Sequence, residues 1–260
     1  MHHVSAVELV ALGVVAFLAG GLNAVAGGGT LLTFPALVAV GLPVVSANVT
    51  NTVALGPGYA GGIAGYRREL DGQSATVRRL LPVVLLGASI GATLLLVTSK
   101  RVFGVIVPFL VLGASLLLLA QPRLQRRLQR PHPRTGEARA GERRVLVAVG
   151  VFLATIYGGY FGGVLGVVLL ATLGIAMTDH LQRLNALKNV LQFAINGVAV
   201  IVFALFGPVQ WGIVLVMAPL TALGGWSGSR AARRLRPEVL RRTVGVFGIV
   251  CAVVLAIRLR

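Results

Sequence analysis

The chain of 260 residues is 56% hydrophobic and only 12% charged, with a mean hydropathy of +0.88. A soluble domain is about 25% charged, so this chain has too few charged residues to cover a water-facing surface. The composition therefore excludes a soluble globular protein and indicates an integral membrane protein.

The net charge of +17 does not indicate a nucleic-acid partner. The basic residues are concentrated in blocks between apolar runs, at 67–79, 123–144 and 230–242. This is the distribution expected of cytoplasmic loops under the positive-inside rule, and anionic lipid headgroups attract the same residues. No soluble basic and aromatic surface exists to bind nucleic acid. The partner that the charge pattern predicts is the lipid bilayer.

The first 120 residues form one predicted transmembrane repeat, residues 1–120, with five apolar segments. The second segment is too short to cross a bilayer, which takes roughly 20 apolar residues per helix. Three glycines, Gly27, Gly28 and Gly29, come directly before it, which is typical of a broken helix at a substrate site. The five segments are 4–26, 30–42, 46–66, 77–97 and 102–120.

A polar segment at 121–143, rich in Arg, Gln and Pro, is predicted to be a cytoplasmic linker to a second repeat, residues 144–260. The second segment of this repeat is again short and follows glycines, here Gly158, Gly159, Gly162 and Gly163. The five segments are 145–161, 164–177, 182–206, 210–230 and 239–258.

A single shift of 137 residues aligns the two halves. It places Asn48 on Asn185 and Pro82 on Pro219. The loop 67–79 carries four arginines and its counterpart 206–210 carries none. The loop 98–101 carries two cations and its counterpart 230–242 carries six. Because equivalent loops then lie on opposite sides of the membrane, the fold class expected is an all-α integral membrane protein of two inverted repeats, each with about five helical segments including one short or broken helix.

With the basic loops inside, both termini are expected to lie outside. Small-residue pairs such as Gly87 with Gly91, and Gly224 with Gly228, are expected to pack helices within one chain, with a homodimer as the other use of such pairs.

The stretch RLNALKNVLQFAIN, at 183–196, carries a polar stripe on a hydrophobic helix. Its members recur at helical spacing and share one face. A lysine inside a membrane helix costs roughly 2.5–3.5 kcal/mol. Lys188 therefore either reaches the headgroup region or faces a cavity and attracts an anion. The amides serve either as bonds between helices or as donors to an oxyanion. The stripe comprises Asn185, Lys188, Asn189, Gln192 and Asn196.

A second polar cluster begins the third segment of the first repeat, where the shift matches Asn51 to Lys188 and Thr52 to Asn189. Clusters from two inverted halves are expected to meet near the membrane midplane, beside the broken helices. The substrate-binding residues predicted from both halves are Lys188, Asn48, Asn51, Asn185, Asn189, Thr30, Thr50, Thr52, Gln192, Gly27, Gly28, Gly29, Gly162 and Gly163.

Other chemistries find no support in the sequence. Six of the seven acidic residues lie at segment ends or in loops, and Glu8 lies near the start of the first segment, which gives no obvious carboxylate relay or sodium site. The four histidines lack metal-ligand spacing. No GxxxxGK[ST] loop is present to bind ATP. An enzyme, a metal and a cofactor are therefore not expected.

The ordered glycine and asparagine motifs resemble the TauE/SafE family of membrane permeases, the sulfite exporter family. The resemblance implies a multi-pass protein of the bacterial inner membrane that transports sulfur-containing anions such as sulfite and organosulfonates. The stretches that carry it are GLNAVAGGGTLLTFPALVAVGLPVVSANVTNTVA (21–54), GGYFGGVLG (158–166), RLNALKNVLQFAIN (183–196) and GGWSGSRAARRLRP (224–237).

Two classes of function remain open at this stage. The first is a secondary transporter, in the export direction, that binds a small oxyanion at the interface of the repeats. The second is a passive anion channel, or a membrane scaffold whose polar stripe only packs helices.

Overall fold

A computed structural model describes residues 5–25, 27–128, 138–177, 179–231 and 237–258 of the chain. Within these ranges the protein contains helices and turns, and no strand. The helices are α1 Ala6–Val25, α2 Thr30–Ala39, α3 Val44–Gly65, η1 Arg67–Leu70, α4 Ser74–Val97, α5 Lys100–Leu128, α6 Ala138–Tyr160, α7 Leu165–Ala176, α8 Leu181–Phe206, α9 Trp211–Ala231 and α10 Pro237–Arg258.

The all-α membrane fold predicted from the apolar runs is confirmed. In the described residues, five helices are long and apolar enough to cross a membrane: α1, α4, α5, α8 and α9. α2 and α7 are the short helices of the two halves, with 10 and 12 residues. The segment expected as a linker begins and ends in helices, because α5 continues to Leu128 and α6 starts at Ala138.

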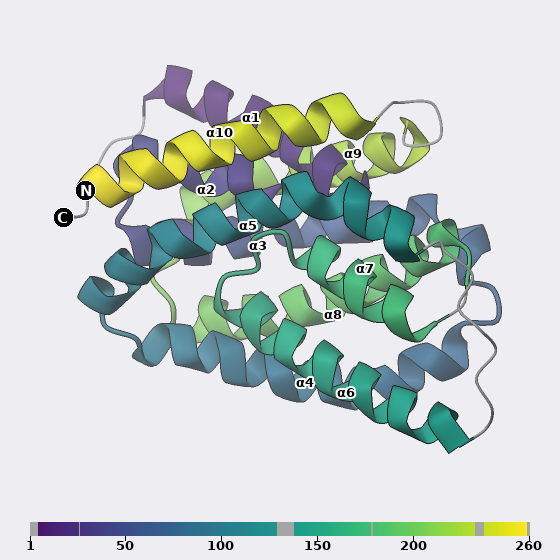
Figure 1. Cartoon of the computed structure of the whole chain (residues 1–260). Helices are drawn as coiled ribbons and strands as arrows, with labels where there is room; N and C mark the ends of the chain where they lie inside the picture. The colour runs from purple at the N-terminus through teal and green to yellow at the C-terminus, as the bar shows by residue number, and fades with distance from the viewer. Residues whose placement is uncertain (1–4, 26, 129–137, 178, 232–236, 259–260) are drawn as a thin grey trace.

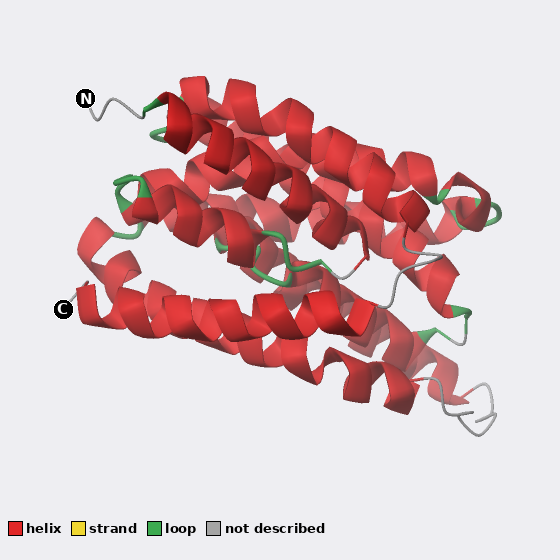
Figure 2. Cartoon of the chain, turned by 90° about the horizontal axis from the view of Figure 1, so that it is seen from above, coloured by secondary structure: helices red, strands yellow, loops and turns green. Residues whose placement is uncertain are grey.

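The long helices run side by side, and their connections lie mainly at the two ends of the bundle (Figure 2). α3 and α8 pack against each other at its centre, with α1 and α9 on the α3 side and α4 and α6 on the α8 side (Figure 1). α3 is less apolar than the five spanning helices, and every described residue from 45 to 56 is buried. Its polar residues therefore face protein and avoid lipid.

Large apolar side chains cover the outside of the bundle, for example Val10, Phe109 and Leu215. A protein in water would pay for this exposure, whereas a lipid-facing surface requires it.

The fourth helix of each half packs mainly against helices of the other half. α4 packs against α6 and α8, and α9 packs against α1 and α3. Glycines make both contacts close: a β-carbon at Gly91 would lie 2.1 Å from the carbonyl oxygen of Ile156, and one at Gly224 would lie 2.0 Å from that of Phe17. The expectation that these glycine pairs pack helices within one chain is confirmed.

The helix starts keep the spacing of the proposed duplication. Val44 and Leu181, Ser74 and Trp211, and Lys100 and Pro237 are each 137 residues apart. Together with the reciprocal packing of α4 and α9, this is the arrangement that two related halves require. The opposite orientation of the halves in a membrane stays a prediction.

Candidate functional site

The breaks between α1 and α2 and between α6 and α7 meet inside the bundle. Gly27 has φ +82° and Gly162 has φ +71°, a region that glycine enters without steric cost. A β-carbon on Gly27 would lie 2.5 Å from the Cα atom of Gly166. The backbones at Gly27 and Gly166 are therefore in contact, and neither residue has room for a side chain. We call this contact between the two breaks the crossing.

Lys188 lies at this crossing, on α8. Its side chain is completely buried (0% exposed), and its Nζ donates to the carbonyl oxygen of Asn23 at 3.5 Å. Asn23 is in the last turn of α1, where carbonyl groups lack partners from their own helix and form the negative end of the helix dipole. The alternative of a lysine that reaches the headgroup region does not describe this side chain.

Two amide side chains of α8 beside Lys188 are buried without partners. Both polar atoms of Asn189 and both polar atoms of Gln192 lack a hydrogen bond within the described part of the chain. Buried amide groups are bonded in most proteins, so each exception needs an explanation. A β-carbon at Gly166 would lie 3.1 Å from Oε1 of Gln192 and 3.2 Å from Cδ of Lys188, which places these groups at the same crossing.

The side chain of Asn23 stabilises the break between α1 and α2 by two hydrogen bonds. Its Oδ1 accepts a hydrogen bond from the backbone N–H of Gly29 at 2.7 Å, and its Nδ2 donates to the Tyr59 hydroxyl at 3.3 Å. The side chain thus closes the turn between α1 and α2 and ties it to α3, while the carbonyl group of the same residue receives Lys188.

The polar residues of α3 have partners on neighbouring elements. Asn48 Nδ2 donates to the carbonyl oxygen of Tyr160 at 3.1 Å, at the end of α6. The hydroxyl of Thr33, on α2, donates to Asn51 Oδ1. Position 160 corresponds to position 23 under the 137-residue shift, so a side chain from the opposite half reaches the last turn of each broken helix.

Several predicted residues lie elsewhere or are already engaged. The Thr50 hydroxyl accepts the backbone N–H of Gln210 at 3.0 Å, at the connection from α8 to α9. Thr52 donates to the carbonyl oxygen of Asn48 in its own helix at 3.0 Å. Gly28 faces the side chain of Leu118. The carbonyl of Gly163 accepts the hydroxyl of Tyr157, next to the second break.

Thr30 and Asn185 are buried. Thr30 begins α2, and Asn185 lies one turn before Asn189 with its Oδ1 unpartnered. The crossing itself thus brings together Gly27, Lys188, Asn189 and Gln192 of the predicted set.

The structure adds residues that the prediction left out of the site. These are Asn23, Thr33, Tyr59, Gly62 and Gly166. A β-carbon at Gly62 would lie 3.6 Å from Cγ of Asn189, so this glycine of α3 faces the α8 stripe. Among them, Asn23 carried a signal in the sequence, since it is an asparagine six residues before the last glycine of the first break.

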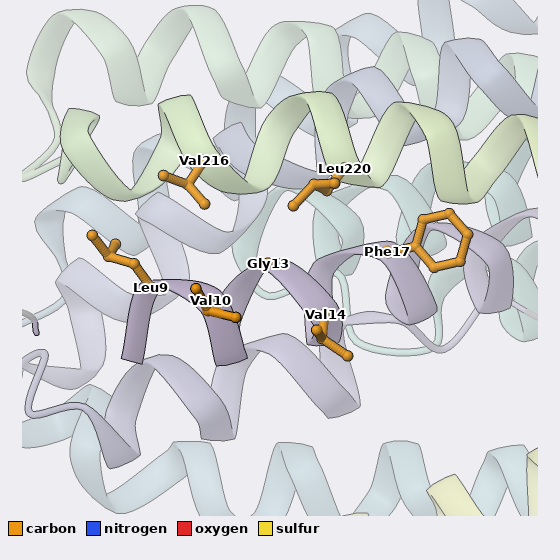
Figure 3. Close-up of a pocket in the computed structure, with 7 residues that line it drawn as sticks. All are labelled: Leu9, Val10, Gly13, Val14, Phe17, Val216 and Leu220. Carbon is orange, nitrogen blue, oxygen red and sulfur yellow. The ribbon is translucent and has the colours of Figure 1, made fainter. Parts of the chain in front are cut away.

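An apolar groove between α1 and α9 is a separate feature (Figure 3). It has a volume of about 560 Å³, and only carbon atoms appear in its labelled side chains. Val10 and Val14, two of its lining residues, are exposed, so the groove opens toward lipid. Because its lining side chains are apolar, they offer an anion no hydrogen-bond donor. Its lining residues are Leu9, Val10, Gly13, Val14, Phe17, Val216 and Leu220.

Metal binding has no geometric support in the searched part of the chain, where no three His, Cys, Asp or Glu side chains come together. The chemistry available at the crossing is one ammonium group and several amide donors, which suits the binding of an oxyanion.

Comparisons with known proteins agree with a transport role. The family model described as "Sulfite exporter TauE/SafE" matches residues 12–255. A "Probable membrane transporter protein ORF9" of Sinorhizobium sp is 30% identical, over 95% of this chain and 90% of the relative. A "Probable membrane transporter protein YfcA" of Escherichia coli K12 is 31% identical over 91% and 85%. A "Probable membrane transporter protein" of Haemophilus influenzae Rd is 25% identical over 88% and 87%. No solved structure matches.

Proposed function

The chain belongs to the sulfite exporter TauE/SafE family of membrane transporters, and from this premise we propose that it is a secondary transporter of a small sulfur-containing oxyanion, such as sulfite or an organosulfonate. The observation that carries the proposal is Lys188, fully buried beside the unpartnered amides of Asn189 and Gln192 where two broken helices cross.

The binding chemistry follows from these groups. The lysine supplies a positive charge, and the amides supply N–H donors to an acceptor with several oxygens. Hydrogen bonds between a charged group and its partner are about twice as strong as neutral ones. An anion bound there would place a negative charge beside Lys188, a residue type whose burial in a membrane costs roughly 2.5–3.5 kcal/mol. It would also accept hydrogen bonds from the N–H groups of Asn189 and Gln192, which have no partner among the described residues.

Hydrogen bonds join elements of the two repeats at both ends of the bundle. At one end, Gln73 Nε2 donates to the carbonyl oxygen of Arg183 at 3.0 Å. At the other, the Ser46 hydroxyl donates to the carbonyl oxygen of Pro208 at 2.7 Å. In our proposal this is an occluded conformation, and opening one end at a time gives alternating access around the crossing.

Export is the direction we propose. A membrane potential that is negative inside favours the exit of an anion by about 2.3 kcal/mol per charge per 100 mV. In our proposal the basic loop 67–79 lies on the cytoplasmic side of the bacterial inner membrane and both termini lie outside, as the positive-inside rule favours.

The test is sulfite flux through the purified protein in proteoliposomes. A transporter should give a rate that saturates with sulfite concentration, and unlabelled sulfite on the far side should drive counterflow of labelled sulfite. Flux without saturation or counterflow would identify a passive channel. No flux for sulfite or any organosulfonate would favour a scaffold and overturn the proposal.

A further inference from the structure

The two repeats contribute unequally to the crossing. On α3, Asn48 Nδ2 donates to the carbonyl oxygen of Tyr160 and Asn51 Oδ1 accepts from the Thr33 hydroxyl, while Oδ1 of Asn48 is buried without a partner among the described residues. On α8, all four amide atoms of Asn189 and Gln192 are buried without a partner among the described residues. At the crossing, the amide donors that are buried and unpartnered in the described part of the chain therefore belong to α8, in the second repeat.

The repeat matches make the same distinction. The 137-residue shift pairs Asn189 with Thr52, whose hydroxyl bonds its own helix, and pairs Gln192 with Leu55, which has no polar group. A ligand bound equally by the two repeats would need equivalent donors from both halves. Among the described residues at the crossing, the amide N–H groups that are buried without a partner come from α8 alone.

Gly62 of α3 leaves room for one methyl group next to Asn189. Gly62 of α3 faces Asn189, and the nearest atoms to an added β-carbon would be Cβ of Ala24 and Cγ of Asn189, both at 3.6 Å. That is an ordinary van der Waals distance, so one methyl group fits there when the site is empty. The matched position in the other repeat is Ala199, which already carries that methyl group.

We propose, building on the function proposed above, that the anion binds in a one-sided subsite formed by Lys188, Asn189 and Gln192, and that Gly62 determines the largest anion accepted. The ammonium group neutralises the charge, and the two amides donate to its oxygens. The hydrogen atom of Gly62 leaves room for a substituent on the sulfur atom. A methyl group at this position would fill that room and discriminate against organosulfonates relative to sulfite.

The experiment measures binding of sulfite and of ethanesulfonate to the full-length protein in detergent by isothermal titration calorimetry. Gly62→Ala should weaken ethanesulfonate binding about tenfold (about 1.4 kcal/mol) and sulfite binding much less, because the added methyl group would occupy the room that the ethyl substituent needs. Gly56→Ala is the matched control: it lies on the same helix, is buried, and its added β-carbon would meet only Val200 Cγ2 at 3.5 Å. The control should bind both anions as the wild type does.

Asn189→Ala should weaken binding of both anions at least about tenfold, the loss typical of one hydrogen bond to a charged group. Gln192→Ala gives a second measurement if the first variant does not fold. Unchanged affinity in a folded Asn189 or Gln192 variant would overturn the one-sided subsite. Equal affinity losses for the two anions in Gly62→Ala would overturn its role in selectivity.

The same measurements separate this inference from the proposed function. If the wild type binds sulfite with the expected variant pattern but shows no flux in proteoliposomes, the subsite stands and the transport proposal fails. If the wild type transports sulfite while the variants bind normally, transport stands and the subsite fails. If it neither binds nor transports these anions, both fail.

Discussion

Thr33 and Asn51 show how a polar pair is satisfied inside this bundle. The Thr33 hydroxyl donates to the Asn51 amide oxygen, and both side chains are buried. Removing the donor leaves an acceptor in an apolar interior, which costs more than the bond itself contributes. Buried pairs of this kind fix the positions of α2 and α3 beside the crossing.

Thr33→Val should therefore destabilise the protein by about 1–3 kcal/mol, because it keeps the shape of the side chain and leaves the buried Asn51 oxygen without its donor. The measurement is the thermal unfolding midpoint of the purified protein in detergent. Thr93→Val is the control, since Thr93 lies on the exposed surface of α4. Equal midpoints for both variants would show that the Thr33–Asn51 bond contributes nothing to stability.

The broken helices depend on glycine at the crossing. An alanine at position 27 would have to adopt φ near +82° and would bring its β-carbon within 2.5 Å of the Gly166 Cα atom. The left-handed backbone alone costs a non-glycine residue roughly 1–2 kcal/mol, and the steric overlap adds to it.

Gly27→Ala should consequently lower the yield of monodisperse protein or its unfolding temperature, as measured by size-exclusion chromatography and a thermal melt. Gly104→Ala should have little effect, because no atom lies within 4 Å of its added β-carbon. A Gly27→Ala protein as stable as the Gly104→Ala protein would contradict the close contact between the two breaks.

Much of this architecture could be predicted from the sequence. Apolar runs and glycine clusters located most helix ends to within a few residues, and two short helices appear where glycines precede them. The exceptions are the end of α5 at Leu128 and the start of α6 at Ala138, because polar and charged turns continue both helices into the segment predicted to be a linker. The pairing of polar atoms was beyond prediction. Asn23 and Lys188 are 165 residues apart, and only the tertiary fold brings the Asn23 carbonyl to Lys188. For the same reason the sequence did not reveal that Thr50, in the polar cluster of α3, faces the connection at Gln210.

In the whole molecule, the two halves contact each other through reciprocal helix packing and reciprocal hydrogen bonds. α4 packs on the second half and α9 on the first, and the side chains of Asn48 and Lys188 each reach the last turn of a broken helix in the opposite half. If the halves are inverted, the connections at 71 and 210 should lie on opposite sides of the membrane.

Single cysteines at Asp71 and Gln210, introduced in a Cys251→Ala protein, test this orientation. Both positions are exposed, and Cys251 is the one native cysteine of the chain. A membrane-impermeant maleimide should label Gln210→Cys in intact spheroplasts and Asp71→Cys in inside-out vesicles. Labelling of both cysteines from the same side would contradict inverted repeats.

Sulfite flux in proteoliposomes with Lys188→Ala and Lys188→Arg tests most directly whether Lys188 binds the transported anion. The protein should be reconstituted at equal amounts, with a thermal melt to show that each variant is folded. Loss of the charge should reduce flux at least about tenfold, corresponding to 1.4 kcal/mol or more of lost anion stabilisation, and arginine should retain more flux than alanine. Wild-type flux in folded Lys188→Ala would contradict the account.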